Sequence, residues 1–210
     1  MRTLKVYRDY HDIGCDILAK DEVTIKPGLT VLVGCNGAGK STFIHQLCDV
    51  LECERTPYLE YNNLKDGGEH AMGAAGLRQD FRKVATMALS SEGENIVINL
   101  GDFAKKIGDL VRKKSSGNQI WVFFDALDSG MSIDNIVETK DFFKFVQKTD
   151  ADKEFYFIVA ANEYEMARGE ACFDVNAGEY VTFSDYEDFR SFIMSSRKLK
   201  DARKYKKRSR

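Results

Sequence analysis

The sequence predicts an α/β protein, a sandwich whose core sheet is mainly parallel. Predicted strands and helices alternate along its 210 residues, a pattern that produces parallel sheets covered by helices. Two predicted strands are continuous apolar runs, IWVFF at residues 120–124 and FYFIVA at residues 155–160. Such runs are typical of strands buried on both faces. A chain of this length can bury a substantial core within one domain.

The first 34 residues are predicted to supply three strands, near residues 3–7, 22–26 and 30–34. The run TVLV in the third strand is apolar enough to be buried, and the turn KPGL at residues 26–29 precedes it. This β-rich segment is expected to form an antiparallel flank of the main sheet.

A glycine-rich stretch, GCNGAGKS, follows the third strand and fits the P-loop pattern GxxxxGK[ST]. Its glycines let the backbone wrap closely, with N–H groups pointing inward where phosphate oxygens can bind. Lys40 would add a positive charge beside the β- and γ-phosphates, and the Ser41 hydroxyl would complete a Mg²⁺ shell. Apolar residues at helical spacing then predict a helix near residues 40–52.

A glycine-rich turn that carries GKS by chance is the alternative interpretation. The buried strand before the stretch and the amphipathic helix after it make that alternative much the weaker one. The stretch is therefore predicted to bind a nucleoside triphosphate. The residues expected to contact it are Gly34, Asn36, Gly37, Ala38, Gly39, Lys40, Ser41 and Thr42.

The middle of the chain carries a second candidate anion site. A strand is predicted near residues 57–61, a glycine-rich mobile loop at 62–76 and a helix near 72–89. Ser91-Glu92-Gly93-Glu94 then opens a helix near residues 93–114. As a capping box, Ser91 would cap this helix and Glu94 would reach back to it. A capped helix N-terminus is also an anion site, so the two interpretations are compatible.

The apolar strand near residues 119–125 ends in Asp125, the pattern of a central strand that delivers a carboxylate to Mg²⁺. A core strand that merely ends in Asp is common, but the preceding glycine-rich stretch and the following DSG favour the metal site. The remaining elements are predicted by the same periodicities: a helix near 132–149, strands near 155–160 and 170–183, and a helix near 184–204.

Together, GCNGAGKST, the strand that ends in Asp125 and the following DSGMS resemble the ABC-type ATPases, most closely their SMC and RecF branch. LKVYRDYHDI and EVTIKPGLTVLVG are similar to the opening of those proteins. The resemblance covers most of residues 1–183. It implies a P-loop NTPase sandwich, ATP and Mg²⁺ as cofactors, and an ATP-dependent homodimer. In that dimer ATP lies between the P-loop of one subunit and the signature motif of the other.

The resemblance also implies roles for individual residues. Ser91, Gly93 and Glu94 would form the signature motif that acts in trans. Arg8 and Tyr10 would hold the adenine and ribose side, although Tyr10 fits a half-buried aromatic residue equally well. Gln79 matches a Q-loop glutamine and would join Ser41 and Asp125 at the metal. Asn162 occupies a switch position that is often His, and its amide can donate and accept hydrogen bonds but cannot carry a proton.

Two departures from the family pattern bear on catalysis. The general base of the family is a Glu directly after the strand-ending Asp, and this chain has Ala126 there, which cannot activate water. Either Asp128 or another carboxylate takes that role, or hydrolysis is slow and the nucleotide mainly clamps a dimer. The region between Gln79 and Ser91 is also short, so a reduced helical arm is expected. The predicted catalytic set is Lys40, Asp125, Asp128 and Asn162.

The charge distribution separates a body, residues 1–196, from a tail, residues 197–210. The tail holds nine of the 31 Lys and Arg residues and one of the 33 Asp and Glu residues. The predicted ATPase domain at 1–196 therefore carries 22 basic against 32 acidic residues. The basic tail is expected either to bind DNA or RNA, to fold back on the acidic body, or to be a solvated terminus.

The composition argues against a membrane protein, a secreted protein and a disulfide-bonded protein. No run of eighteen apolar residues is present, so no membrane insertion is expected, and the first residues are too polar for a secretory signal. The five cysteines are scattered and form no CxxC pair, which favours free thiols in a reducing compartment, and thus the cytoplasm.

Three functional hypotheses follow. The first is an ATPase that dimerises around ATP, in DNA maintenance or defence. The second is a nucleotide-switched binding module with weak hydrolysis and an unidentified protein partner, favoured by Ala126 and Asn162. The third is a small P-loop kinase, which the sequence favours least, because the Arg residues lie mostly near the termini and DSGMS has no kinase role.

Overall fold

The computed structural model describes residues 1–8, 18–63, 72, 74–75, 77–78, 80–90, 92–112, 118–150 and 152–208. Its strands are β1 (Arg2–Lys5), β2 (Glu22–Ile25), β3 (Gly28–Val33), β4 (Tyr58–Asn62), β5 (Gln119–Asp125), β6 (Glu154–Ala160), β7 (Ala171–Asp174) and β8 (Glu179–Val181). Its helices are α1 (Lys40–Cys53), α4 (Phe81–Leu89), α5 (Glu92–Arg112), α6 (Ile133–Thr149), α7 (Tyr164–Ala167) and α8 (Tyr186–Arg208).

A six-stranded sheet in the order β4-β5-β6-β3-β7-β8 forms the centre of the fold. The first five strands in this order run parallel, and β8 pairs antiparallel with β7 at the edge. The predicted α/β class and mainly parallel core are confirmed. β1 and β2 form a separate antiparallel pair, so the predicted antiparallel flank holds for these two strands. The third strand of that segment, β3, lies instead inside the parallel sheet.

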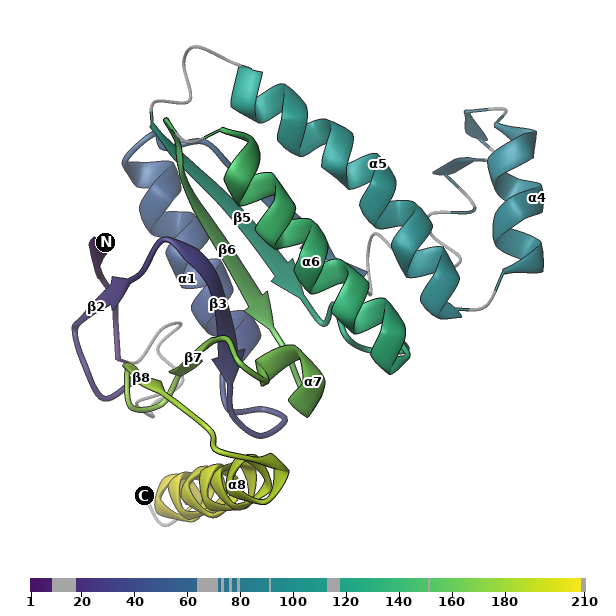
Figure 1. Ribbon diagram of the computed structural model, residues 1–210. Coiled ribbons are helices and arrows are strands. Elements are labelled where there is room, and N and C mark those ends of the chain that lie inside the picture. Colours follow the sequence, from purple (N-terminus) through teal and green to yellow (C-terminus); the bar gives the residue numbers. More distant parts are fainter. Residues whose placement is uncertain are drawn as a thin grey trace.

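Helices cover both faces of the central sheet. Figure 1 shows α5 and α6 side by side over one face and α1 over the other. Side chains of the central strands alternate between the two layers, as the strand period requires. Trp121 and Phe123 of β5 pack on the α1 side, whereas Val122 and Phe124 pack on the side of α5 and α6. This arrangement explains why β5 is a continuous apolar run.

Two predicted elements differ in the structure, and one helix was not predicted. The strand expected at 170–183 is two strands, because the chain turns at Gly178, which has a φ of 68°. Of the helix expected at 72–89, α4 forms the last part, and the Asp80 side chain starts it by accepting the Lys83 N–H. The short helix α7 was not predicted, since four residues are too few for a periodic signal. The loop expected at 62–76 lies largely outside the described residues.

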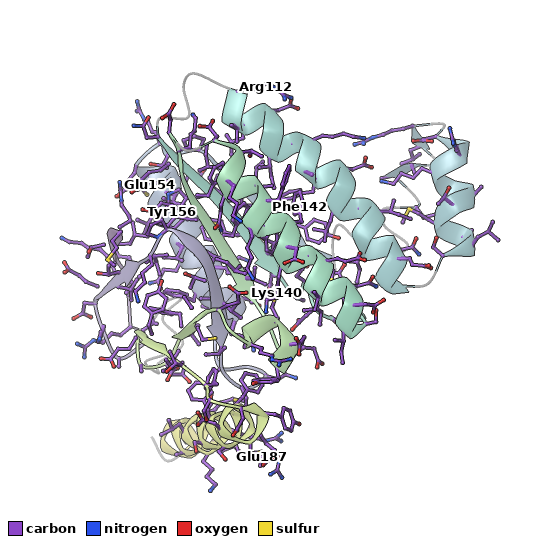
Figure 2. All side chains as sticks on the ribbon, in the orientation of Figure 1. Arg112, Lys140, Phe142, Glu154, Tyr156 and Glu187 are labelled. Carbon is purple, nitrogen blue, oxygen red and sulfur yellow. The ribbon has the colours of Figure 1, made fainter. Side chains whose placement is uncertain are left out.

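Figure 2 labels two side chains of α6, Phe142 and Lys140. Phe142 helps to line a cavity of about 220 Å³ between α5 and α6, together with Leu100 and Gly101 of α5. Lys140 is buried, and its ammonium donates to the backbone carbonyls of Glu165 (2.9 Å) and Arg168 (2.7 Å). Lys140 therefore fixes α7, the segment that follows the carboxyl end of β6, against α6.

No helix in the described ranges combines the length and the apolar character needed to cross a bilayer. The four cysteines within the described residues, Cys35, Cys48, Cys53 and Cys172, are free thiols. Burial raises the pKa of Cys172 to about 12, so this thiol is held in its neutral form.

Candidate functional site

The glycine-rich loop, residues 34–39, connects β3 to α1. Gly34, Gly37 and Gly39 have φ angles of 146°, 77° and 108°, in the region that glycine adopts without strain. At Gly34 a side chain would also collide with the loop, because an added Cβ would lie 2.9 Å from the Cβ of Ala38. Gly39 is the N-cap of α1. The sequence therefore folds this segment into a tight turn that ends at a helix N-terminus, where backbone N–H groups lack partners within the helix.

Three side chains from distant segments hold the loop. Asn176, after β7, donates its Nδ2 to the Ala38 carbonyl at 2.8 Å. Ser196 of α8 accepts the Cys35 N–H on its Oγ at 3.1 Å, and Lys200 of α8 donates to the Asn36 carbonyl at 2.7 Å. Ser196 is buried. None of these three hydrogen bonds uses an N–H group of the α1 N-terminus.

Lys40, the first residue of α1, lies over the loop with 9% of its surface exposed. Its ammonium donates to the Gly34 carbonyl at 2.8 Å and to Oδ1 of Asn162 at 3.0 Å. Burial lowers the pKa of Lys40, and the negative charge of Asp128 opposes that shift. Both acceptors of this buried ammonium are neutral oxygens, an arrangement that an incoming anion would improve.

Ser41 and Asp125, the predicted metal ligands, are in contact. The Ser41 hydroxyl donates to Oδ1 of Asp125 at 3.0 Å, although the two residues lie in different elements, α1 and the end of β5. Oδ2 of Asp125 accepts the side-chain amide of Asn62, at the end of β4, at 3.2 Å. A hydroxyl and a carboxylate are hard oxygen ligands of the kind that Mg²⁺ prefers, so these two residues fit a magnesium ion. Asn62 would orient the carboxylate from behind.

Asp128 belongs to the segment that follows β5 and is bonded to the segment that follows β6. Only 2% of its surface is exposed. Its Oδ2 accepts the backbone N–H groups of Asn162 at 2.6 Å and Glu163 at 2.7 Å. Its Oδ1 is buried and finds no hydrogen-bond partner within the described part of the chain. Burial raises the pKa of Asp128, and the two backbone N–H groups oppose the shift. Asp128 is therefore a carboxylate with one structural oxygen and one unsatisfied oxygen.

Ala126, at the position where the resembled family has its general base, has a φ of 53°. This left-handed conformation is uncommon for a residue with a side chain. It turns the chain away from the strand direction immediately after Asp125. Two residues after this turn, Asp128 lies at the site.

Three of the other predicted site residues, Arg8, Gly93 and Glu94, lie within the part of the chain that the structure describes. Arg8 forms an exposed two-point ion pair with Asp21, with its Nε and Nη2 at 2.8 Å and 3.1 Å from the two carboxylate oxygens. Gly93 and Glu94 lie in the first turn of α5, as expected. Tyr10, Gln79 and Ser91 lie outside the described residues, so their assignments stay predictions.

Sequence reasoning missed four residues of the cluster: Asn62, Asn176, Ser196 and Lys200. Two signals could have suggested some of them. Asn62 is a polar residue at the end of a predicted strand, in the same position as Asp125. Ser196 lies at helical spacing from the core residue Phe189, so a polar side chain interrupts the buried face of α8 there. The contact of Lys200 depends on where α8 packs and has no local signal.

No protein-family model fits the chain, and no curated protein matches its sequence. The class of the protein therefore comes from its fold and site. It is a mixed α/β protein whose candidate site lies at the carboxyl edge of a parallel sheet. β3, β4, β5 and β6 bring the glycine-rich loop, Asn62, Asp125 and Asn162 to that edge, where open α/β sheets bind their ligands.

Proposed function

We propose that this protein binds ATP with Mg²⁺ on the glycine-rich loop, as a P-loop, and hydrolyses it. The observation that supports this most directly is the 3.0 Å hydrogen bond between Ser41 and Asp125. Two motifs that are remote in the sequence each predict a magnesium ligand, and their oxygens meet beside the buried Lys40. A glycine-rich turn without function would not require such a partner.

The chain's own groups would hold the nucleotide in two ways. The backbone N–H groups at the start of α1, together with the positive end of its dipole, would bind phosphate oxygens. The ammonium of Lys40 would exchange its neutral acceptors, the Gly34 carbonyl and Asn162, for phosphate oxygens. Asn162 would then be released from Lys40, and its amide could hydrogen-bond to the γ-phosphate or to the attacking water.

Ser41 and Asp125 would hold Mg²⁺. When bound, the ion would neutralise the negative charge that develops between the β- and γ-phosphates. The unsatisfied Oδ1 of Asp128 makes this residue the candidate that accepts a proton from water. Its raised pKa supports that role, because a base with a raised pKa binds a proton more readily.

A nucleotide-switched binding protein with slow hydrolysis is the second candidate. The residue next to Asp125 is Ala126, in a left-handed turn, so no carboxylate occupies the position of the usual base. In this case ATP would act mainly as a clamp, and the rate of phosphate release separates the two candidates.

The magnesium assignment is tested by replacing Ser41 with alanine. Without the hydroxyl, Mg²⁺ loses one of its two protein ligands, so the gain in ATP affinity that Mg²⁺ provides should fall about tenfold. Titration calorimetry with ATP, in the presence of Mg²⁺ and of a chelator, measures that gain. Ser41→Thr is the matched control, since it keeps the hydroxyl. An equal Mg²⁺ effect in Ser41→Ala and wild type would contradict the assignment.

The resemblance to ABC-type ATPases further suggests a composite site, in which the N-terminus of α5 in one subunit meets ATP bound to another. ATP–Mg²⁺ should then convert a monomer into a dimer, and Ser91→Arg should block dimerisation while ATP affinity stays within about twofold. Size-exclusion chromatography with light scattering measures the mass of each form. If ATP leaves the wild type monomeric in all conditions, residues 91–94 are a helix cap and no signature motif.

A further inference from the structure

The C-terminal helix α8 is attached to the glycine-rich loop. In Figure 1 it lies across the end of the sheet at which β3 enters that loop. Phe189 of α8 is buried in the core, and Ile193 packs against the hydrophobic residues on both faces of the sheet. Ser196 and Lys200 continue this face and contact the loop at consecutive residues, Cys35 and Asn36. The contact is thus built on a helix that the core holds in place.

Lys200 lies beside the apex of the loop. Its Nζ donates to the Asn36 carbonyl at 2.7 Å. A Cβ added at Gly37 would lie 3.6 Å from Cδ and 3.7 Å from Nζ of Lys200. The ammonium is therefore next to the residue at which the loop turns toward the α1 N-terminus.

Among the residues that the structure describes, no carboxylate neutralises the charge of Lys200. Its acceptor is a neutral carbonyl, and it forms no ion pair with any carboxylate in the described ranges. Lys40 also donates only to neutral acceptors, a carbonyl and an amide oxygen, although the negative charge of Asp128 acts on it. Two ammonium groups thus bind carbonyls of one short loop, at Gly34 and Asn36, and the structure describes no carboxylate that accepts a hydrogen bond from either. Ammonium groups that donate only to neutral oxygens favour the approach of an anion.

We propose that Lys200 is a second cation of the nucleotide site and binds the phosphate chain together with Lys40. This inference rests on the proposed function, since it assigns a further residue to the same site. The lysine side chain is a flexible stem that carries a point charge, so its ammonium can move from the Asn36 carbonyl to a phosphate oxygen while Ser196 keeps α8 in position. The C-terminal helix is then a functional part of the ATP site.

The test compares four variants by titration calorimetry with ATP–Mg²⁺ and with inorganic tripolyphosphate. Lys200→Ala should weaken both ligands about tenfold, because the contact is with the phosphate chain. Lys200→Gln should weaken them equally, although its amide can still donate to the Asn36 carbonyl. Lys200→Arg should retain most of the affinity. Lys198→Ala, an exposed lysine on the same helix, is the matched control and should bind like wild type.

Each outcome has one meaning. If Lys200→Gln binds like wild type, the residue only holds the loop through a neutral hydrogen bond, and the inference is wrong. If Lys200→Ala and Lys198→Ala both bind like wild type, the inference is also wrong, while ATP binding by wild type leaves the proposed function standing. If wild type binds neither ligand, the proposed function itself fails. A direct charge contact would be further supported if salt weakens the affinity of the wild type more strongly than the affinity of Lys200→Ala.

Discussion

Replacing Lys40 with alanine is expected to weaken ATP binding at least tenfold, or about 1.4 kcal/mol. Lys40 is the cation that the loop motif itself supplies, and it is buried against the Gly34 carbonyl and Asn162. An exchange of these neutral acceptors for phosphate oxygens would make ATP binding more favourable, and alanine cannot make that exchange. Titration calorimetry with ATP–Mg²⁺ measures the loss.

The positive charge of Lys40 is not expected to stabilise the fold at pH 7. Burial lowers the pKa of Lys40, so the folded state binds its proton less readily than the unfolded state does. This difference lowers stability fully at pH values below the folded-state pKa, and the penalty declines as the pH rises from that value to the unfolded-state pKa. Lys40→Met, which keeps the packing of the stem, should therefore melt at or above the wild-type temperature at pH 7. Unchanged ATP affinity in a folded Lys40→Ala protein would overturn the P-loop assignment.

The sequence predicted those parts of the fold that depend on local pattern. β5 and β6 were recognisable because a strand buried on both faces is apolar throughout, and α1 and α5 because their apolar residues recur at helical spacing. The division between β7 and β8 was missed because both strands are short, although the turn-forming residues Asp174, Asn176 and Gly178 mark the turn between them. The position of β3 inside the parallel sheet depends on long-range pairing, which local sequence does not encode.

The same distinction applies to the candidate site. The glycine-rich loop and Asp125 could be predicted because each is a contiguous motif at the end of an apolar strand. Their meeting, through Ser41, follows from the parallel sheet that brings the strand ends together. Asn176 and Lys200 act on the loop from segments near the C-terminus, and only tertiary packing brings them there. Asp128 was predicted from its place in DSGMS, but its burial and its bonds to the segment after β6 could not be read from that motif.

Replacing Asp128 with asparagine is expected to lower the rate of ATP hydrolysis at least about 100-fold, the usual contribution of a general base. Asparagine keeps the shape of the side chain, and its Oδ1 can still accept the N–H groups of Asn162 and Glu163. It removes the negative charge and the ability to take a proton. ATP affinity should change by less than about threefold, because Asp128 is not among the groups expected to bind phosphate. Phosphate release under saturating ATP–Mg²⁺ measures the rate.

The pH profile of the wild type provides an independent check on the same residue. Burial raises the pKa of Asp128, so hydrolysis should decrease as the pH falls through that raised pKa, and Asp128→Asn should lack this acidic limb. The raised pKa also means that the folded state binds the proton more readily than the unfolded state does. The resulting contribution to stability is present at acidic pH and is lost as the pH rises through the folded-state pKa. At pH 7 Asp128→Asn should therefore melt at or above the wild-type temperature.

Asp128→Ala separates the catalytic role from the structural one. Alanine leaves the N–H groups of Asn162 and Glu163 without their acceptor, so this variant should lose both hydrolysis and about 1–3 kcal/mol of stability. A carboxylate that only anchored the chain after β6 would give another pattern, in which Asp128→Asn hydrolyses ATP like wild type and only Asp128→Ala is impaired. In that case Asp128 is not the base. The second candidate, a nucleotide-switched binding protein with slow hydrolysis that Ala126 suggests, then becomes the better account of the site.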